Sequence, residues 1–153
     1  MSADTEKLVS MIQSLLQSQS LGVLATRGEE YPYCTLVGFA GTEDLRYIIF
    51  ATLRNTRKYA NIRSYPMISI LIDSRSNRVE DFKDAMALTV LGNAHEAKGE
   101  EKEKLSGLYL ARHPHLKEFL LDPDCALMVL EVERYIMVTR FQQVMEMDVS
   151  TCL

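Results

Sequence analysis

Short runs of apolar residues, separated by polar turns, recur along most of the chain. Runs of this kind, bounded by Gly, Asn, Asp and Pro, are typical of β-strands. The predicted strands are residues 21–26, 33–40, 45–51, 67–73, 86–97, 125–140 and 142–149. The run 125–140 is too long for one flat strand, so we expect a bend near Glu133. Gly92 indicates a bulge or bend in the strand 86–97.

Helical spacing of apolar residues marks the segments between these strands. Segment 5–19 would bury Leu8, Ile12 and Leu15 on one face, and segment 99–111 would bury Leu105 and Tyr109. The predicted helices are residues 5–19, a short helix that starts at Asn55 or Thr56 and ends before Pro66, residues 99–111 and residues 116–121. The polar stretch 74–84 is expected to be a long loop.

The order of these elements predicts the fold class. Consecutive hairpins with apolar interiors favour an antiparallel β-barrel, because closing the sheet removes its exposed edges. We therefore expect one domain over residues 1–153, with an N-terminal helix (5–19) and a barrel of six or seven strands (21–149) carrying flanking helices.

Composition narrows the functional classes. The chain has 153 residues and a net charge of −4, which argues against binding nucleic acid through phosphate neutralisation. No apolar run is long enough to span a membrane, and the acidic start does not resemble a signal peptide. Cys34, Cys125 and Cys152 fit neither a disulfide framework nor a metal site, so we expect reduced thiols and a cytoplasmic location.

The start of the short central helix is the strongest candidate for a binding site. Arg57 and Lys58 fall in its first turn, with Arg54 just ahead, where the helix macrodipole disfavours cations. A bound anion would reverse that disadvantage. Free backbone N–H groups, the hydroxyl of Thr56 and the two cations would together suit a phosphate. The alternative is an ordinary basic turn at the surface.

Three histidines are the other candidates for chemistry. For His95, His113 and His115 the simpler interpretation is a solvated or hydrogen-bonded side chain. A haem ligand is the alternative, with His113 or His115 as the first choice. The acidic residues form no metal-binding pattern, and no Ser-His-Asp or Cys-His spacing indicates a nucleophile.

Several short motifs, in this order and spacing, carry a resemblance to a known family. They are LGVLAT, YPYCTLVGFA, FATLRNTRKYANI, PMISILIDSRSN and LTVLGNAHEA. The chain resembles the pyridoxamine 5′-phosphate oxidase-like family of FMN-binding split β-barrels over most of its length. Its later part is similar to a subgroup of related proteins, some of them linked to haem utilisation.

The resemblance implies a set of cofactor contacts. These are Thr35, Leu36 and Val37 on the strand beside the flavin ring, Ala51 and Thr52 beside the ribityl chain and ring, Thr56, Arg57 and Lys58 at the FMN phosphate with Asn61 in support, and Ser74, Arg75 and Asn77 as ring or substrate contacts. The resemblance also implies a homodimer with FMN in the cleft between subunits.

Two departures from the family pattern affect the reaction. Thr35 stands where true pyridoxamine phosphate oxidases carry an Arg, and the chain lacks the Trp and Arg pair of their C-terminus, having no Trp at all. The vitamin B6 reaction is therefore not expected. The resemblance instead implies an FMN-dependent oxidoreductase for an unidentified small substrate. Alternatives are a haem-binding protein of the same fold and a non-catalytic flavin-binding module, and a deazaflavin or haem could replace FMN.

Overall fold

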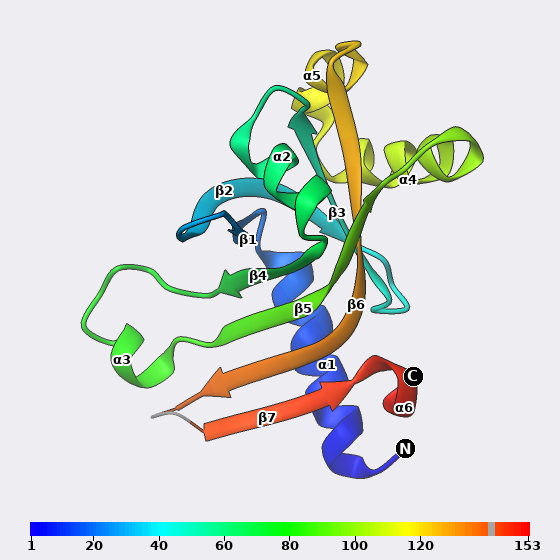
Figure 1. Cartoon of the computed structure of the whole chain (residues 1–153). Helices are drawn as coiled ribbons and strands as arrows, with labels where there is room; N and C mark the ends of the chain where they lie inside the picture. Colours follow the sequence, from blue (N-terminus) through cyan, green and yellow to red (C-terminus); the bar gives the residue numbers. More distant parts are fainter. Residues whose placement is uncertain (141–142) are drawn as a thin grey trace.

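Seven antiparallel strands form one sheet that closes into a barrel (Figure 1). The computed structural model describes residues 1–140 and 143–153. The strand order is β3-β2-β1-β4-β5-β6-β7, and β3 also pairs with β6, which closes the first six strands. The strands are β1 (Leu21–Arg27), β2 (Pro32–Gly41), β3 (Tyr47–Leu53), β4 (Met67–Asp73), β5 (Ala87–Glu96), β6 (Cys125–Thr139) and β7 (Gln143–Asp148). The predicted barrel of six to seven strands is confirmed.

Helices connect and cover the strands. They are α1 (Ala3–Ser18), α2 (Arg57–Ser64), α3 (Asp81–Asp84), α4 (Gly99–Arg112), the 3₁₀ turn η1 (Pro114–Leu116), α5 (Lys117–Leu121) and α6 (Val149–Cys152). The short helix α2 follows β3 directly and contacts β1. Among the described residues, no helix combines the length and apolar character needed to cross a membrane.

The apolar residues form two cores, one on each side of the sheet. The main core fills the barrel and includes Phe39, Ile70 and Val90, and α1 packs against it. A second cluster lies on the outer side of β3 and β6, where Tyr109 of α4 and Leu120 of α5 are buried. Since β3 and β6 are covered on both sides, they are fixed between the two cores.

A β-bulge bends the paired strands β5 and β6. The register of β5 and β6 shifts between Leu91 and Gly92, because these residues pair with Arg134 and Val132 and leave Glu133 without a partner. A Cβ atom at Gly92 would overlap the carbonyl oxygen of Glu131, so the bulge requires glycine there. The predicted bend and the predicted role of Gly92 are both confirmed.

Two predicted segments differ from the structure. The stretch 74–84 was expected to be a plain loop, but it ends in the short helix α3. In the turn before this helix, the Asp81 carboxylate accepts the backbone N–H groups of Ser76 and Asn77 at 2.8 and 2.7 Å. The last strand was expected over 142–149. Gln142 lies outside the described residues, and β7 ends at Asp148, after which Val149 begins α6.

Candidate cofactor site

Helix α2 has Thr56 as its N-cap, so the structure selects the second of the two predicted start residues, Asn55 and Thr56. The Thr56 hydroxyl accepts the N–H of Tyr59 at 3.4 Å and donates to the carbonyl oxygen of Leu53 at 2.8 Å. The hydroxyl oxygen of Thr52 is 3.0 Å away. The single hydroxyl hydrogen of Thr56 is therefore used inside the chain, so in this conformation Thr56 shapes the turn rather than offering a donor to a ligand.

The next two residues supply the positive charge of this turn. Arg57 is exposed and Lys58 half-buried, and the first turn of α2 holds no acidic residue. In the described part of the chain, neither cation forms an ion pair with a carboxylate. The guanidinium of Arg57 instead lies 5.3 Å from the ring centre of Tyr33 on β2.

This donor set fits a phosphate. The first N–H groups of an α-helix have no intrahelical acceptor, and here they lie beside Arg57 and Lys58. A dianion at this end of α2 would meet the macrodipole, the free N–H groups and both cations with favourable sign. Without an anion, the two positive side chains stand at the helix end that disfavours them.

Arg54, just before α2, is engaged elsewhere. Its guanidinium forms two bonds to the Glu96 carboxylate, at 2.7 and 3.3 Å, and a third to the carbonyl oxygen of Pro123 at 2.8 Å. Glu96 also accepts the phenol of Tyr59 at 2.7 Å. The hydrogen bond from Arg54 is the main reason that the pKa of Glu96 lies below its ordinary value, with Tyr59 contributing. Sequence reasoning missed Glu96, because nothing near it in the chain connects it to residue 54.

Next to the start of α2, the barrel wall is open between β2 and β3. Strand β2 pairs with β1 from Pro32 to Gly38, but it pairs with β3 only from Phe39 to Gly41. In the described residues, the β3-facing edge of β2 before Phe39 has no strand partner. Backbone groups along such an edge are available to a ligand. This edge includes the predicted ring contacts Thr35, Leu36 and Val37.

The side chains of these ring contacts point to both faces of β2. Thr35 and Val37 share the inner face, and Val37 belongs to the barrel core. Leu36 is on the outer face and 63% exposed. On β3, Ala51 packs into the second cluster, whereas Thr52 lies beside Thr56.

The remaining predicted residues lie in two different parts of the structure. Asn61 belongs to the α2 group, where its amide donates to the hydroxyl of Thr26 at 3.0 Å and holds α2 against β1. Ser74 closes the β4–β5 connection by exchanging hydrogen bonds with Met86. Arg75 pairs with Asp73 at 3.1 Å, and Asn77 has a positive φ of 62°.

Leu36, Arg75 and Asn77 line a common cavity of about 350 Å³ on the outer face of the sheet. Thr56, Arg57 and Lys58 are not part of its lining. Arg57 reaches Tyr33 on the inner face of β2, and Leu36 points to the opposite face. Within a single chain, the fold therefore brings together Thr52, Thr56, Arg57, Lys58 and Asn61. The outer cavity, lined by Leu36, Arg75 and Asn77, lies at a separate place.

The histidines are used for structure or lie at the surface. His113 is 3% exposed, and its Nε2 is 2.7 Å from the carbonyl oxygen of Phe39. Its neighbour Tyr109 donates to the carbonyl oxygen of Gly38 at 3.0 Å. His95 meets Glu101 at 2.9 Å, and His115 is exposed. The hydrogen-bonded interpretation holds for His95 and His113, and the Nε2 atom of His113 is not free for an axial bond to haem iron.

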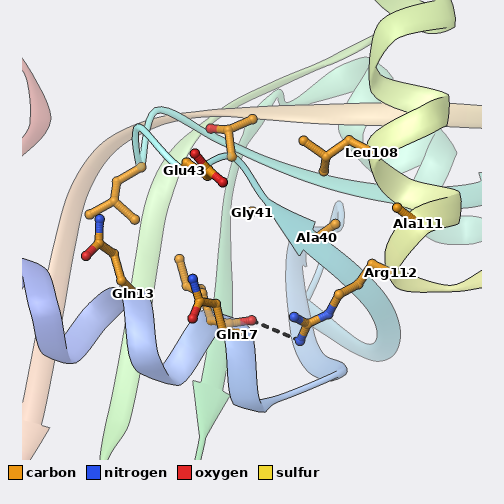
Figure 2. Close-up of a pocket in the computed structure, with 11 residues that line it drawn as sticks. Gln13, Gln17, Ala40, Gly41, Glu43, Leu108, Ala111 and Arg112 are labelled. Atoms are coloured by element: carbon orange, nitrogen blue, oxygen red, sulfur yellow. Dashed lines mark hydrogen bonds between the residues drawn. The ribbon is translucent and has the colours of Figure 1, made fainter.

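A separate cavity of about 460 Å³ lies between α1, the β2–β3 turn and α4 (Figure 2). None of the predicted site residues lines it. Arg112 crosses its edge and donates to the carbonyl oxygens of Leu16, at 3.0 Å, and Gln19 at the end of α1. This arginine caps the C-terminus of α1, so the contact joins two helices.

Comparisons with known proteins agree with this architecture. The chain superposes on a heme binding protein from Mycobacterium smegmatis with a TM-score of 0.83 and 19% identity. The superposition covers 94% of this chain and 59% of the heme binding protein, so this chain spans less than two thirds of that protein's length. It also superposes on a protein related to general stress protein 26, of the pyridoxinephosphate oxidase family, from Clostridium acetobutylicum, with a TM-score of 0.75 and 15% identity over 97% and 99% of the two chains.

A third similar structure is a FAD-binding protein from Mesorhizobium loti, with a TM-score of 0.67 and 14% identity over 84% of this chain and 90% of that one. At these identities the likenesses establish the fold. A search of curated proteins gave no significant match. The sequence model of the family described as pyridoxamine 5′-phosphate oxidase matches residues 8–144, most of the chain. The chain therefore belongs to the pyridoxamine 5′-phosphate oxidase family.

Proposed function

We propose that this protein binds FMN, with the flavin phosphate on the first turn of α2, and that it acts as a flavin-dependent oxidoreductase on a small molecule. The observation that carries the proposal is the pair of cations, Arg57 and Lys58, at a helix N-terminus, neither of which has a carboxylate partner within residues 1–140 and 143–153. A phosphate there would be held by charge-assisted hydrogen bonds, which are stronger than neutral ones. The FAD-binding neighbour from Mesorhizobium loti supports a flavin as the ligand.

The remaining contacts would come from the open edge beside α2. Along the open edge of β2, the backbone groups of the segment 35–37 that do not bond to β1 are available, and Thr52 lies next to the phosphate turn. When bound, the flavin would supply the electron-transfer chemistry, while the chain binds it, orients it and excludes water. The same basic turn would accept any phosphate-bearing ligand, including a deazaflavin.

A homodimer is part of this proposal. Leu36 and Leu71 flank Val23 on the outer sheet face, and Leu21 and Met67 are also exposed there. Apolar side chains gathered on one face favour burial against a second surface. A second copy of the chain would cover this face. The flavin site would then consist of α2 of one subunit and the outer cavity of the other. This supports the inter-subunit cleft expected from the family resemblance.

The absence of tryptophan and the replacement of an arginine by Thr35 argue for a substrate other than a vitamin B6 phosphate. Haem is the second ligand to consider, because one similar structure is a heme binding protein. The buried Nε2 of His113, held by Phe39, makes flavin the better supported ligand.

The deciding experiment is the visible absorption spectrum of the protein purified without added cofactor, followed by titration with FMN and with riboflavin. We expect a two-band flavin spectrum, or uptake of FMN with fluorescence quenching, and weaker binding of riboflavin because it lacks the phosphate. A Soret band with indifference to FMN would contradict the proposal. Reduction of bound flavin by a nicotinamide donor tests the enzymatic part, and sedimentation tests the dimer.

A further inference from the structure

We infer that Glu96 is a positioning residue for the flavin phosphate, because its carboxylate holds the first turn of α2 in place. This inference rests on the proposed function, since it concerns how firmly the phosphate-binding turn is fixed. Glu96 does not itself touch the phosphate in this proposal. It acts through Tyr59 and Arg54.

Glu96 joins three parts of the chain at one carboxylate. It is the last residue of β5, and its side chain is only 13% exposed. One oxygen accepts the phenol of Tyr59, on α2, at 2.7 Å, and the other accepts Arg54, in the β3–α2 connection, at 2.7 Å. Arg54 continues to the start of β6, where it donates to the carbonyl oxygens of Pro123 and Asp124.

These contacts fix the direction of the phosphate-binding groups. Tyr59 is the third residue of α2, and its N–H is bound by Thr56 while its phenol is bound by Glu96. The backbone and the side chain of Tyr59 are therefore both held by hydrogen bonds, and Arg57 and Lys58 immediately precede it. A turn that is fixed before binding loses less conformational entropy when the ligand arrives, so its affinity is higher.

The fold does not depend on this carboxylate alone. Asn61 bonds to Thr26, and Ile62 packs into the barrel core, and neither of these contacts involves Glu96. These contacts lie in the middle of α2, one turn beyond the phosphate site. Loss of Glu96 should therefore loosen the first turn of α2 and leave the rest of the helix in place.

The pair with Arg54 has a second consequence for charge. A free carboxylate near the phosphate would repel it, and Arg54 neutralises Glu96 through two hydrogen bonds. In return Arg54 is withheld from the ligand, so the cations left for the phosphate are Arg57 and Lys58. Substituting Tyr59 instead of Glu96 removes one hydrogen bond without altering any charge, and this separates positioning from electrostatics.

The experiment compares dissociation constants for FMN and riboflavin in Tyr59→Phe, Glu96→Gln and the double variant, measured by fluorescence quenching. We expect the FMN constant to rise about 3-fold in Tyr59→Phe, with riboflavin unchanged, because only FMN carries the phosphate. In Glu96→Gln we expect a smaller rise, because removing the negative charge and releasing Arg54 partly offset the lost positioning. The double variant should be no weaker than Tyr59→Phe, since both changes act on the same contact.

The control is Glu101→Gln. Glu101 is an exposed carboxylate that also forms a short pair, with His95 at 2.9 Å, but it does not contact α2. It should leave both constants unchanged. An unaltered ratio of the FMN and riboflavin constants in Tyr59→Phe, or equal weakening of both ligands in that variant, overturns the inference. Wild-type protein that binds FMN no better than riboflavin overturns the proposed phosphate site itself, and the inference with it.

Discussion

The first turn of α2 and the last turn of α4 both carry positive or ionisable side chains, but they use them in opposite ways. At the end of α4, Arg112 donates to carbonyl oxygens of Leu16 and Gln19, and the neighbouring His113 meets that of Phe39. At the start of α2, Arg57 and Lys58 have no carboxylate partner among the described residues.

The helix macrodipole explains why the difference matters. A cation at a helix C-terminus is favourable, so Arg112 is where a purely structural arginine should be. Cations at an N-terminus are unfavourable, so Arg57 and Lys58 reduce stability until an anion arrives. A polar side chain whose hydrogen bonds are all made inside the protein indicates a structural role. A charged side chain that the helix macrodipole disfavours, and that has no ion-pair partner, indicates a ligand-binding role. Four predictions follow from this contrast, in order of expected size.

The largest effect is expected from Arg57→Ala combined with Lys58→Ala. Removing both cations should weaken FMN binding by about 100-fold or more, because charge-assisted hydrogen bonds to phosphate are each worth roughly 1.5–3 kcal/mol. The melting temperature should not fall, because neither side chain pairs with a carboxylate in the described residues and removing cations from a helix N-terminus relieves the macrodipole penalty, which offsets the lost contact of Arg57 with Tyr33. Lys83→Ala with Lys117→Ala, two exposed cations elsewhere, is the matched control. Unchanged FMN affinity in the first double variant would refute the phosphate assignment.

The second effect concerns the end of α4. His113→Leu should lower the free energy of unfolding by about 1–3 kcal/mol, because the buried carbonyl oxygen of Phe39 loses its partner. The affinities for FMN and riboflavin should stay as in the wild type. Chemical denaturation together with flavin titration measures both. A selective loss of haem or flavin binding in a stably folded His113→Leu protein would give this histidine a ligand role.

The third effect is a loss of stability in alkali, also at the end of α4. Burial raises the pKa of Tyr109 to about 12. The unfolded chain ionises this phenol near the ordinary value of 10.0, so stability present below that pH is lost as the pH rises toward about 12. Tyr109→Phe should flatten the fall in melting temperature between these two values. A fall as steep as in the wild type would assign the alkaline loss to other groups.

The smallest effect is a loss of stability in acid at the start of α2. The pKa of Glu96 is lowered mainly by the hydrogen bond from Arg54, so its stabilising contribution is present above the ordinary value of 4.5. That contribution is lost as the pH falls from there through the folded-state pKa. Glu96→Gln should show a shallower decline of melting temperature in this acidic range. Identical acid profiles would mean that the Arg54 contact adds little to stability.

Local features of the site were predictable from the sequence. Thr56 as the N-cap and Pro66 as the end signal of α2 depend on backbone preferences within a few residues. The bulge at Gly92 follows from the residue type that a close backbone approach requires. The short helix α3 was missed because it has only four residues and no side-chain cap.

The partners of these residues could not be predicted in the same way. Arg54 and Glu96 are 42 positions apart, and only the pairing of β5 with β6, and of β6 with β3, brings them together. For the same reason, the sequence could not tell which cations near α2 stay free. It also could not tell that Leu36 points away from Arg57, because that depends on the register of β2 against β1.

The sequence by itself therefore determined the number and order of the strands, the family, and the basic turn at residues 56–58. Periodicity, capping and charge are properties of neighbours in the chain, and they can be seen without the fold. The tertiary structure decided which side chains were already engaged: His113 by Phe39, Arg54 by Glu96 and Thr56 by Leu53. Such contacts depend on distances between segments remote in sequence, which only the closed barrel sets.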